Sequence, residues 1–345
     1  MMANLAKGLN PLKYDVHLGL VTQQPPEPGI LPDSVSVHAM GARRVRTGVL
    51  SLLRLAWRVR PDIILSGIAH LNFLVLMLRP ILPPGCRVIV RQNGPVSLNS
   101  GSRIARFFYP RLYLRADAVV CQTCAMAADL DAATRGSCTV RVLANPVDLE
   151  AIRSIAGNSN PRWEGPGPHL LTVGRLVHEK GFDLLIRAIA SLRAGFPAIG
   201  LTIVGEGRER QVLEELAREL GLEGVVRFAG HEPDPAVWFN GASIFVLSSR
   251  SEGMPNAMLE AAGAGLPIMA TPATGGIAEL LDGQPGVWLA SDVSAAGIAA
   301  VLETAIESLN PGERFPHPWV EPFRIDRAVN AYEAMMDECL AERCR

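Results

Sequence analysis

Short apolar runs alternate with stretches of helical periodicity along the 345-residue chain, and this alternation limits the possible folds more than any other feature of the sequence. In the first half, the runs typical of buried strands are Val16–Val21, Asp62–Leu65, Arg87–Arg91, Ala118–Cys121 and Val140–Leu143. In the second half, they are Leu170–Val173, Leu201–Val204, Val225–Phe228, Ile244–Leu247, Ile268–Ala270 and Val287–Leu289. Because strands that alternate with helices form parallel sheets in βαβ units, we predict an α/β fold and exclude a helical bundle and a β-sandwich.

The length of the chain favours two domains, since a single core rarely serves more than about 250–300 residues. The stretch Gly157–Pro168 is rich in Asn, Ser, Pro and Gly, which is the composition of a linker. We therefore predict two Rossmann-like domains, residues 1–160 and residues 161–325. A C-terminal helix, residues 326–345, is expected to pack back toward the first domain.

Composition narrows the class of protein. With 48% apolar and 19% charged residues, the chain can fill two cores and keep a polar surface, which excludes disordered and fibrous proteins. Six cysteines are too few for a disulfide scaffold, and the first residues have no pattern of a secretory leader. No apolar segment reaches the about 20 residues that a membrane-spanning helix needs. These features predict a reduced, cytoplasmic protein.

The net charge of −1 conceals an uneven distribution of charge. Residues 1–162 carry 19 Lys and Arg against 9 Asp and Glu, whereas residues 163–345 carry 14 against 25. A basic half of this size suggests an anionic partner such as a membrane surface, a nucleic acid or a phosphorylated ligand. Solvated basic faces without a partner are the alternative.

Two segments concentrate the positive charge of the first half. In Arg43–Arg60, apolar residues recur at helical spacing, arginines occupy much of the remainder, and Trp57 lies near the end. Arg103–Arg115 is similarly rich in Arg, Phe and Tyr. Such segments are typical of helices that lie on an anionic membrane, and they equally fit amphipathic helices that cover a sheet.

Candidate phosphate-binding residues follow two strands of the second half. Gly174 permits a tight turn directly after a strand, and Arg175 and Lys180 come next. A guanidinium and an ammonium at the carboxyl end of a parallel strand suit a diphosphate, because open α/β sheets bind ligands at that edge. Gly205 and Gly207 follow the next strand, where paired glycines fit close approach of a ligand and a plain turn equally well.

The most informative segment is residues 244–281, in which a buried strand leads through a loop into a helix. Glu252 lies in the loop and Glu260 lies one turn inside the helix, so the two carboxylates can reach different parts of one ligand. The backbone N–H groups at a helix start bind anions such as phosphate. The residues of this loop and helix start are Gly253, Met254, Pro255, Asn256, Ala257 and Met258. Packing of a core alone does not account for this order of glycines, proline and acids.

The second half resembles the retaining glycosyltransferases of family 4, which have the GT-B fold of two Rossmann-like domains facing across a cleft. The segments GRLVHEKGFDLLI, LTIVGEG, VRFAG and SEGMPNAMLEAAGAGLPIMAT match the signatures of this family in order and spacing. Glu252 and Glu260 coincide with the family's E-x7-E motif, which implies contacts to the donor sugar and to the ribose, respectively.

The same resemblance implies the other donor contacts. Arg175 and Lys180 would hold the donor diphosphate, and the backbone of residues 253–258 would contact sugar and phosphate. Gly230 and His231 lie where the family usually cradles the base of the nucleotide.

The first half is similar to the acceptor-binding domain of the same family through DIILSGIAHLNFL, RVIVRQNGPVS, RADAVVCQT and VLANPVD. Because the family often has histidine where this chain has Asn93, no catalytic histidine is expected there. His70, Arg91 and Asn93 are the candidate residues on the acceptor side, although a core position is the favoured explanation of His70. Cys121 and Cys124 form a single C-x-x-C pair, which predicts two buried small residues and no metal site.

The resemblance implies an enzyme that moves a hexosyl group from a nucleotide diphosphate-sugar to a glycan or a polyprenyl-diphosphate-linked acceptor in bacterial envelope or exopolysaccharide synthesis. We expect a UDP-sugar as donor, with a GDP-sugar as the alternative, and catalysis by Glu252, Arg175 and Lys180 without metal or other cofactor. Of the anionic partners that suit the basic first half, we expect the inner face of an anionic membrane, bound peripherally, and no nucleic acid. A nucleotide-sugar epimerase, a sugar phosphorylase and a non-catalytic nucleotide-sugar-binding protein are the alternatives.

The start of the chain departs from the family pattern. Members of the family open with a buried strand and a glycine-rich loop, whereas residues 1–21 are similar to the helix and strand that follow these. We therefore expect the first domain to lack its first strand and the natural protein to be roughly 15–25 residues longer.

Overall fold

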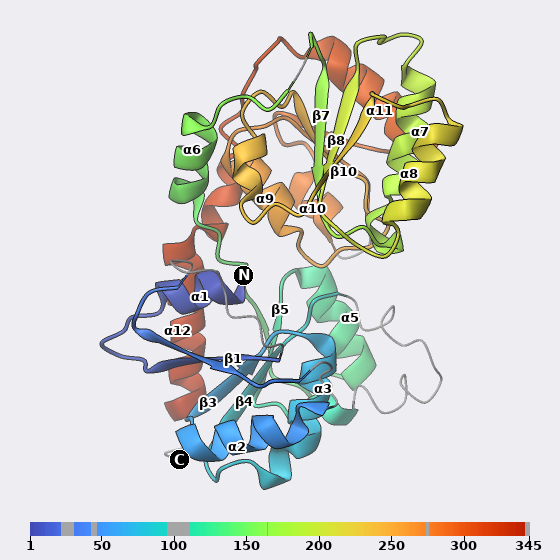
Figure 1. Cartoon of the computed structure of the whole chain (residues 1–345). Helices are drawn as coiled ribbons and strands as arrows, with labels where there is room; N and C mark the ends of the chain where they lie inside the picture. The colour runs from blue at the N-terminus through green and yellow to red at the C-terminus, as the bar shows by residue number, and fades with distance from the viewer. Residues whose placement is uncertain (22–30, 43–46, 95–110, 164, 274–275, 342–345) are drawn as a thin grey trace. The chain divides into compact units, whose positions relative to one another are not determined.

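The computed structural model describes residues 1–21, 31–42, 47–94, 111–163, 165–273 and 276–341. The chain forms two compact units (Figure 1). The first unit comprises Met1–Pro146 together with Pro322–Arg345, and the second unit comprises Val147–Glu321. Every strand pairing among the described residues is parallel, which confirms the predicted α/β fold.

The second unit is built on a six-stranded sheet with the strand order β12-β11-β10-β7-β8-β9. The strands are β7 (His169–Val173), β8 (Gly200–Val204), β9 (Val226–Gly230), β10 (Ile244–Leu247), β11 (Ile268–Ala270) and β12 (Val287–Leu289). The helices are α6 (Leu149–Asn158), α7 (Phe182–Leu192), α8 (Arg210–Glu219), α9 (Asn256–Gly263), α10 (Ile277–Leu281) and α11 (Ala295–Ser308). The 3-10 turns are η3 (His178–Lys180), η4 (Pro235–Trp238) and η5 (Pro318–Phe323), the last of which crosses into the first unit.

Apolar periodicity places α7 and α11 against this sheet. In α7, the buried side chains include Leu185, Ile186 and Ile189, which pack in one cluster with Leu170 of β7 and Ile244 of β10. Each aliphatic side chain buried in this way contributes about 1.5–3 kcal/mol to the stability of the fold. Figure 1 shows α7 and α8 on one side of the sheet and α9 and α10 on the other, so both faces are covered.

The first unit has a four-stranded sheet of order β3-β4-β5-β6 and a separate two-stranded sheet, β1-β2. The strands are β1 (Val16–Leu20), β2 (Val35–Ala39), β3 (Ile63–Ser66), β4 (Arg87–Arg91), β5 (Ala118–Cys121) and β6 (Val140–Val142). The helices are α1 (Met2–Gly8), α2 (Val49–Val59), α3 (Ala69–Leu78), α5 (Cys124–Thr134) and α12 (Ile325–Ala341), with the 3-10 turn η2 (Arg79–Ile81).

The helices α2 and α3 cover one face of the four-stranded sheet, and the first and last helices, α1 and α12, cover the other face. On one face, Val88 and Val119 pack in a cluster with Leu52 of α2 and Leu76 of α3. On the other face, the cluster combines Ile89, Ala118 and Val120 with Leu5 of α1 and five buried residues of α12. These α12 residues are Val329, Tyr332, Met335, Met336 and Cys339. The last helix therefore supplies part of the core of the first unit.

The compact units divide the chain between Pro146 and Val147, ahead of the linker-like stretch Gly157–Pro168. The helix α6 accounts for this difference. It packs against η4 and α9 of the second unit, where Leu149 also lies within reach of Gly263. The roles of the two units as acceptor-binding and donor-binding domains stay predictions.

All the strands predicted from apolar runs are present, within one or two residues at their ends. The strand β2 was not predicted, because only Val35 of its five residues is buried and the run is too polar to stand out. Of the two basic segments, the second falls largely outside the described residues, as does the start of the first. Among the helices that the structure describes, none has the length and apolarity that crossing a membrane requires.

Candidate functional site

The strand order of the second unit identifies where a ligand can bind. From β7, the chain continues to β8 and β9 on one side of the sheet, whereas β10, β11 and β12 lie on the other side. The direction of the strand order therefore changes between β7 and β10. In open α/β sheets, ligands bind outside the carboxyl ends of the strands at such a switch point. The segments that follow β7 and β10 are the ones that contain Arg175, Lys180 and Glu252.

The structure brings Lys180 and Glu252 together, although 72 residues separate them along the chain. The Nζ atom of Lys180 donates to Oε1 of Glu252 at 2.5 Å. Both side chains are largely buried, with 20% and 11% of their surfaces exposed. The hydroxyl of Ser249 donates to the same carboxylate oxygen at 2.6 Å. The carboxylate is thus fixed from two sides at the end of β10.

Gly181 explains how Lys180 reaches this position. It has φ of +63°, and a Cβ at this residue would overlap the carbonyl oxygen of Ser248 at the end of β10. Only glycine allows the loop after β7 to lie this close to β10. The hydroxyl of Ser248 donates to the carbonyl of Lys180 at 2.9 Å and holds the two segments in register.

A second ion pair beside this site was not predicted from the sequence. Arg250, in the loop after β10, donates two hydrogen bonds of 2.7 Å to the carboxylate of Asp183 in the first turn of α7. These bonds from Arg250 lower the pKa of Asp183, and the same bonds raise the pKa of Arg250. A bidentate pair of this kind fixes geometry as well as charge. The only signal in the sequence was opposite charge near two strand ends, which is too common to be informative.

Gly205 and Gly207 allow two loops to pack closely, whereas their contact with a ligand stays a prediction. A Cβ at Gly205 would overlap the carbonyl of Gly174, and a Cβ at Gly207 would overlap the backbone of Leu176. The N–H of Leu176 also donates to the backbone carbonyl of Glu206 at 2.9 Å. The two glycines therefore let the loops after β7 and β8 lie directly against each other.

The start of α9 leaves fewer free amides than the sequence suggested. The N–H of Met258 donates to the carbonyl of Pro255 at 3.1 Å, and the Met258 side chain is fully buried. The N–H of Ala257 has no partner among the described residues, and no side chain caps the helix. Gly253, Met254 and Pro255 are buried, and Asn256 is half-buried. Backbone contacts of residues 253–258 to a ligand stay a prediction.

Glu260 is the second acid of the site. It lies in the middle of α9 and is half-buried, without a hydrogen-bond or ion-pair partner in the part of the chain that the structure describes. Burial raises the pKa of its carboxyl group. A buried carboxyl without a partner is costly in a folded protein, whereas hydroxyl groups of a ligand would satisfy it.

The remaining predicted donor residues lie around the same edge of the sheet. Gly174 is half-buried at the end of β7, and Arg175 is exposed and forms no ion pair with the described residues. Gly230 has φ of +79° at the end of β9 and is followed by the exposed His231. Arg175 and His231 are accessible to a ligand, but the structure gives neither a contact with Glu252.

The first unit has a buried polar network beyond the carboxyl ends of β4 and β6. Arg91 has only 6% of its surface exposed, and it donates to the amide oxygens of Asn93 and Asn145, to the latter at 2.5 Å. Its carbonyl accepts from Asn72 at 2.8 Å. Burial lowers the pKa of Arg91, and no carboxylate among the described residues pairs with it. Of the predicted acceptor-side residues, Arg91 and Asn93 are therefore together, while Asn72 and Asn145 were missed.

Two smaller predictions require correction. His70 is exposed in the first turn of α3, so the favoured core position is wrong. Cys124 is also exposed at the start of α5, and only Cys121 is buried. Burial raises the pKa of Cys121 to about 12, so that its thiol stays protonated at neutral pH. Within the described ranges, no three His, Cys, Asp or Glu residues cluster in a way that could hold a metal ion.

Family profiles match both halves of the chain. The profile described as Glycosyltransferase Family 4 matches residues 1–151, and the profile described as Glycosyl transferases group 1 matches residues 167–308. The chain is 36% identical over 140 residues to the lipopolysaccharide core biosynthesis glycosyltransferase LpsE of Rhizobium meliloti, which covers 40% of this chain and 39% of that one. It is 36% identical over 183 residues to the glycogen synthase of Mycobacterium tuberculosis, which covers 52% of this chain and 42% of that one. The chain thus spans about two fifths of the length of these curated relatives.

Solved structures match nearly the whole chain. The sucrose-phosphate synthase of Thermosynechococcus elongatus has a TM-score of 0.80 at 17% identity and covers 98% of this chain and 92% of its own. The HepE protein of Anabaena, solved in complex with UDP and glucose, has a TM-score of 0.76 at 18% identity and covers 99% and 94%. These likenesses show the GT-B fold. The two profiles, which match residues 1–151 and 167–308, establish that this chain belongs to the group 1 glycosyltransferases of family 4.

Proposed function

We propose that this protein is a retaining glycosyltransferase that moves a hexosyl group from a nucleotide diphosphate-sugar to a glycan or lipid-linked acceptor. The observation that carries this proposal is the pairing of Lys180 with Glu252 at the switch point between β7 and β10. Arg175 and Glu260 lie on the flanking segments and have no partner of their own among the described residues. We therefore expect two cations and two acids to contact one donor at the edge where such a sheet binds nucleotides.

Arg175 and Lys180 stabilise the negative charge of the leaving diphosphate in this reaction. When the bond between the anomeric carbon and the donor diphosphate breaks, negative charge grows on the leaving phosphate oxygen. Arg175 offers a guanidinium fork and Lys180 a compact ammonium, and both are strongest where water is excluded. Lys180 reaches the diphosphate from its position beside Glu252, so that donor binding competes with this ion pair.

The acids orient the donor. Glu252 accepts from sugar hydroxyls as the anomeric carbon becomes oxocarbenium-like, and Glu260 accepts from the ribose hydroxyls. The acceptor oxygen forms its new bond on the face from which the diphosphate leaves, and its proton passes to the leaving phosphate oxygen. The buried Arg91, which no carboxylate of the described chain neutralises, is a candidate contact for an anionic acceptor.

We propose a UDP-sugar as the donor and a reaction without added metal. The HepE structure contains UDP, which supports uridine over guanosine, and the two cations supply the charge that a metal would otherwise provide. In a thermal-shift panel, UDP at 100 times its dissociation constant should stabilise the protein by about 2.7 kcal/mol, and GDP and ADP by less. Turnover should be unchanged by a chelator, and nuclear magnetic resonance of the product should show the anomeric configuration of the donor.

The thermal-shift panel and the turnover assay together separate the alternative activities. An epimerase would convert the donor without an acceptor, and a sugar phosphorylase would require inorganic phosphate. A binding protein would show the UDP shift and no turnover with any acceptor tested. An inverted product, or activity that magnesium or manganese restores after chelation, would contradict the proposed mechanism.

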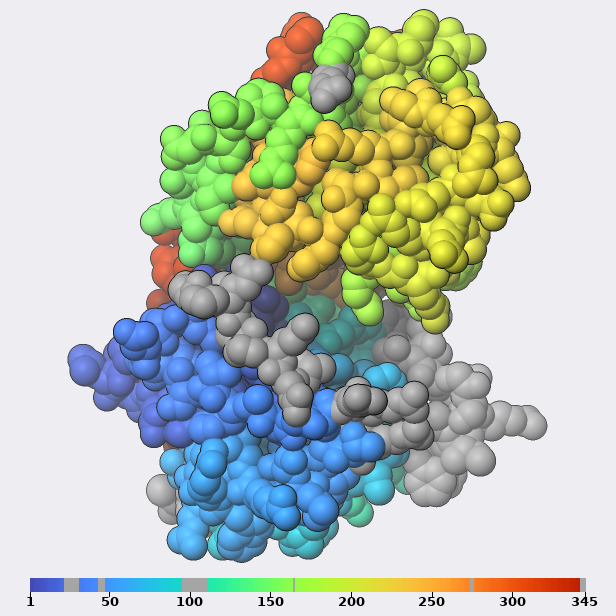
Figure 2. Space-filling view, in the orientation of Figure 1, coloured from blue at the N-terminus to red at the C-terminus, as the bar shows by residue number. Residues whose placement is uncertain are grey.

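The outer surface of the first unit supports a membrane-bound acceptor. Large apolar side chains on and next to α2 and α3 are exposed, namely Leu50 (66%), Trp57 (48%), Met77 (53%) and Ile81 (52%). Arg54 and Arg58 lie on α2. Figure 2 shows that the blue segments that include α2 and α3 form a broad surface of this unit. Aromatic and basic side chains on one face suit the interface of an anionic membrane, and we propose peripheral binding there from the cytoplasmic side.

A further inference from the structure

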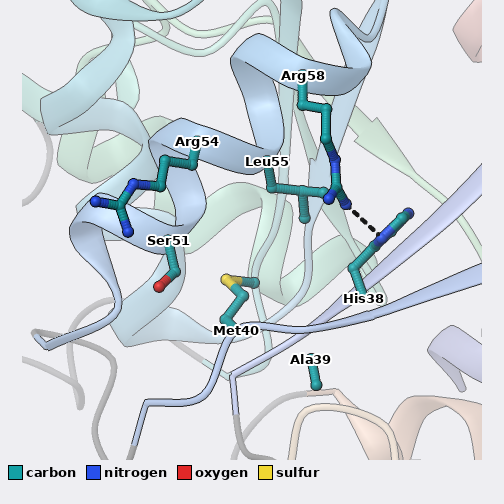
Figure 3. A pocket seen from close by; sticks show the side chains of 7 residues that line it. All are labelled: His38, Ala39, Met40, Ser51, Arg54, Leu55 and Arg58. Atoms are coloured by element: carbon teal, nitrogen blue, oxygen red, sulfur yellow. Dashed lines mark hydrogen bonds between the residues drawn. The ribbon is translucent and has the colours of Figure 1, made fainter.

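The first unit has a cavity of about 340 Å³ between the end of β2 and α2 (Figure 3). Its volume is at the lower end of the about 300–1,000 Å³ that is usual for small-molecule sites. The residues that line it are His38, Ala39, Met40, Ser51, Arg54, Leu55 and Arg58. Figure 3 places Arg58 and His38 at one end, Arg54 and Ser51 at the other, and Met40 and Leu55 between them.

A chain of hydrogen bonds at one end of the cavity fixes the protonation of two histidines. Arg58 lies 2.9 Å from Nδ1 of His38, and because a guanidinium can only donate, this nitrogen carries no proton. The proton of His38 is therefore on Nε2, which lies 2.9 Å from Nδ1 of His17. His17 in turn donates from Nε2 to the carboxylate of Asp15 at 3.2 Å. Both imidazoles are neutral in this arrangement.

At the other end of the cavity, the side chains of an arginine and a serine lack hydrogen-bond partners among the described residues. Arg54 makes no hydrogen bond or ion pair with any residue that the structure describes, and the same holds for the hydroxyl of Ser51. Arg54 and Arg58 are four residues apart on α2, so their side chains leave the same face about 5–6 Å from each other. Two guanidinium groups and a hydroxyl at one cavity are the donors that a phosphate group prefers.

We propose that this cavity binds a phosphate group, held by Arg54 and Ser51 at neutral pH and additionally by Arg58 once His38 is protonated. Met40 and Leu55 provide an apolar wall for the carbon skeleton that carries the phosphate. The site lies within the first unit, separate from the donor residues of the second unit, and does not rest on the proposed transferase activity.

Protonation of His38 would free Arg58 to bind the phosphate group only at acidic pH. A proton on Nδ1 removes the acceptor of Arg58 and adds a like charge beside it, which drives the guanidinium toward the cavity. The groups that face His38 are His17 and Asp15 from β1 and the residue before it, and Arg54 and Arg58 from α2. Burial, Arg58 and His17 lower the pKa of His38. A bound anion raises it again, so anion affinity increases as the pH falls through the pKa of His38.

The test follows the His38 ring resonances of the full-length protein by nuclear magnetic resonance while inorganic phosphate is added. These resonances report on this cavity and not on the second unit. At pH 7, we expect saturation with a dissociation constant of roughly 1 mM, at least tenfold weakening in Arg54→Gln, and a smaller loss in Ser51→Ala. The matched control is Arg60→Gln, which removes the same charge near the end of the same helix but does not line the cavity. Lack of saturation, equal binding by Arg54→Gln, or equal loss in Arg60→Gln would overturn the proposal.

A second titration tests the contribution of His38. Sulfate is the probe here, because its charge does not change between about pH 5 and pH 8. Wild-type protein should bind sulfate about tenfold more tightly at pH 5 than at pH 8. In His38→Asn, the amide oxygen can still accept from Arg58 but cannot be protonated, so the two affinities should agree. Equal affinities in wild-type protein would overturn the part of the proposal that assigns a role to His38.

The source of the phosphate is distinguished with vesicles that contain phosphatidic acid, whose headgroup is a phosphomonoester. If saturating inorganic phosphate displaces the protein from these vesicles, the occupant is a lipid headgroup. If phosphate binds in the cavity without displacing the vesicles, the occupant is a soluble phosphomonoester. Both results support a phosphate site, and neither depends on the membrane surface proposed above, because the first two titrations contain no lipid.

Discussion

Lys180 and Glu252 form an ion pair in this structure. We propose separate roles for them in sugar transfer, and substitutions can test these roles one at a time. Lys180→Ala should weaken UDP binding by roughly 2–5 kcal/mol, because it removes the cation for the diphosphate and leaves Glu252 without its partner. Glu252→Gln should leave UDP affinity unchanged or slightly higher, since it frees Lys180, while turnover falls at least tenfold. Calorimetry with UDP and steady-state rates measure the two effects.

Arg187→Ala is the matched control for these variants, because Arg187 is an exposed cation of α7 outside the site. It should retain the UDP affinity and the rate of the wild-type protein. Equal UDP affinity in wild-type protein and Lys180→Ala would place the diphosphate elsewhere.

Asp117 predicts a dependence of stability on pH in the first unit. Its carboxylate accepts from Arg79, from Arg87 at 2.8 Å and from the N–H of Val88 at 2.6 Å. Burial alone would raise the pKa of Asp117, but these hydrogen bonds outweigh it and the pKa is lowered. The carboxylate therefore stabilises the fold above its unfolded pKa of about 3.9, and this contribution is lost as the pH falls further.

Asp117→Asn should lower the free energy of unfolding by about 2–4 kcal/mol at pH 7, because two arginines lose their charged partner. The difference from wild-type protein should shrink toward pH 3. Urea unfolding at both pH values measures it, with the exposed Asp33→Asn as the control. A deficit of the same size at both pH values would show that packing, and not charge, is responsible.

At the scale of elements, the contact between the loops after β7 and β8 depends on the missing side chain of Gly207. In Gly207→Ala, the new methyl group must displace the backbone of Leu176. We expect a loss of about 1–3 kcal/mol in stability and weaker UDP binding, since the displaced loop contains Arg175. Gly195→Ala is the control, because the nearest atom to its Cβ would be 3.8 Å away. A melting temperature and UDP affinity equal to wild type in Gly207→Ala would contradict this account.

The elements differ in how well their sequence reveals them. Strands such as β10, with four buried residues in succession, are visible because the whole run is apolar. The strand β2 cannot be recognised in the sequence in this way, since four of its five residues are partly or fully exposed. The motif residues Glu252 and Glu260 were found by their spacing, whereas the Arg250–Asp183 pair and the Arg91–Asn145 contact join distant segments through charges or amides that occur everywhere in a sequence. Likewise, the glycine pair Gly205 and Gly207 suggested a ligand, but the backbone that needs the space could only be seen in three dimensions.

At the scale of the whole molecule, the surplus of positive charge in residues 1–162 predicts binding to an anionic membrane. It should bind vesicles that contain anionic lipid, because each Lys or Arg near the membrane surface contributes about 1 kcal/mol to the free energy of binding. High salt screens this attraction and should release the protein. Arg54→Glu together with Arg58→Glu should weaken this binding, and Arg141→Glu, on β6, serves as the control. Cosedimentation measures the bound fraction, and equal binding to neutral and anionic vesicles would remove the electrostatic explanation.

The position of α12 has a consequence for how the protein is made. The ribosome completes the strands β3 to β6 long before α12 emerges, because the second unit, Val147–Glu321, is synthesised in between. At about 5–20 residues per second, this delay is about 10–35 s. During that time, the sheet face of Ile89, Ala118 and Val120 lacks the helix that covers it. We therefore expect the nascent first unit to expose this apolar face until the final helix docks on it.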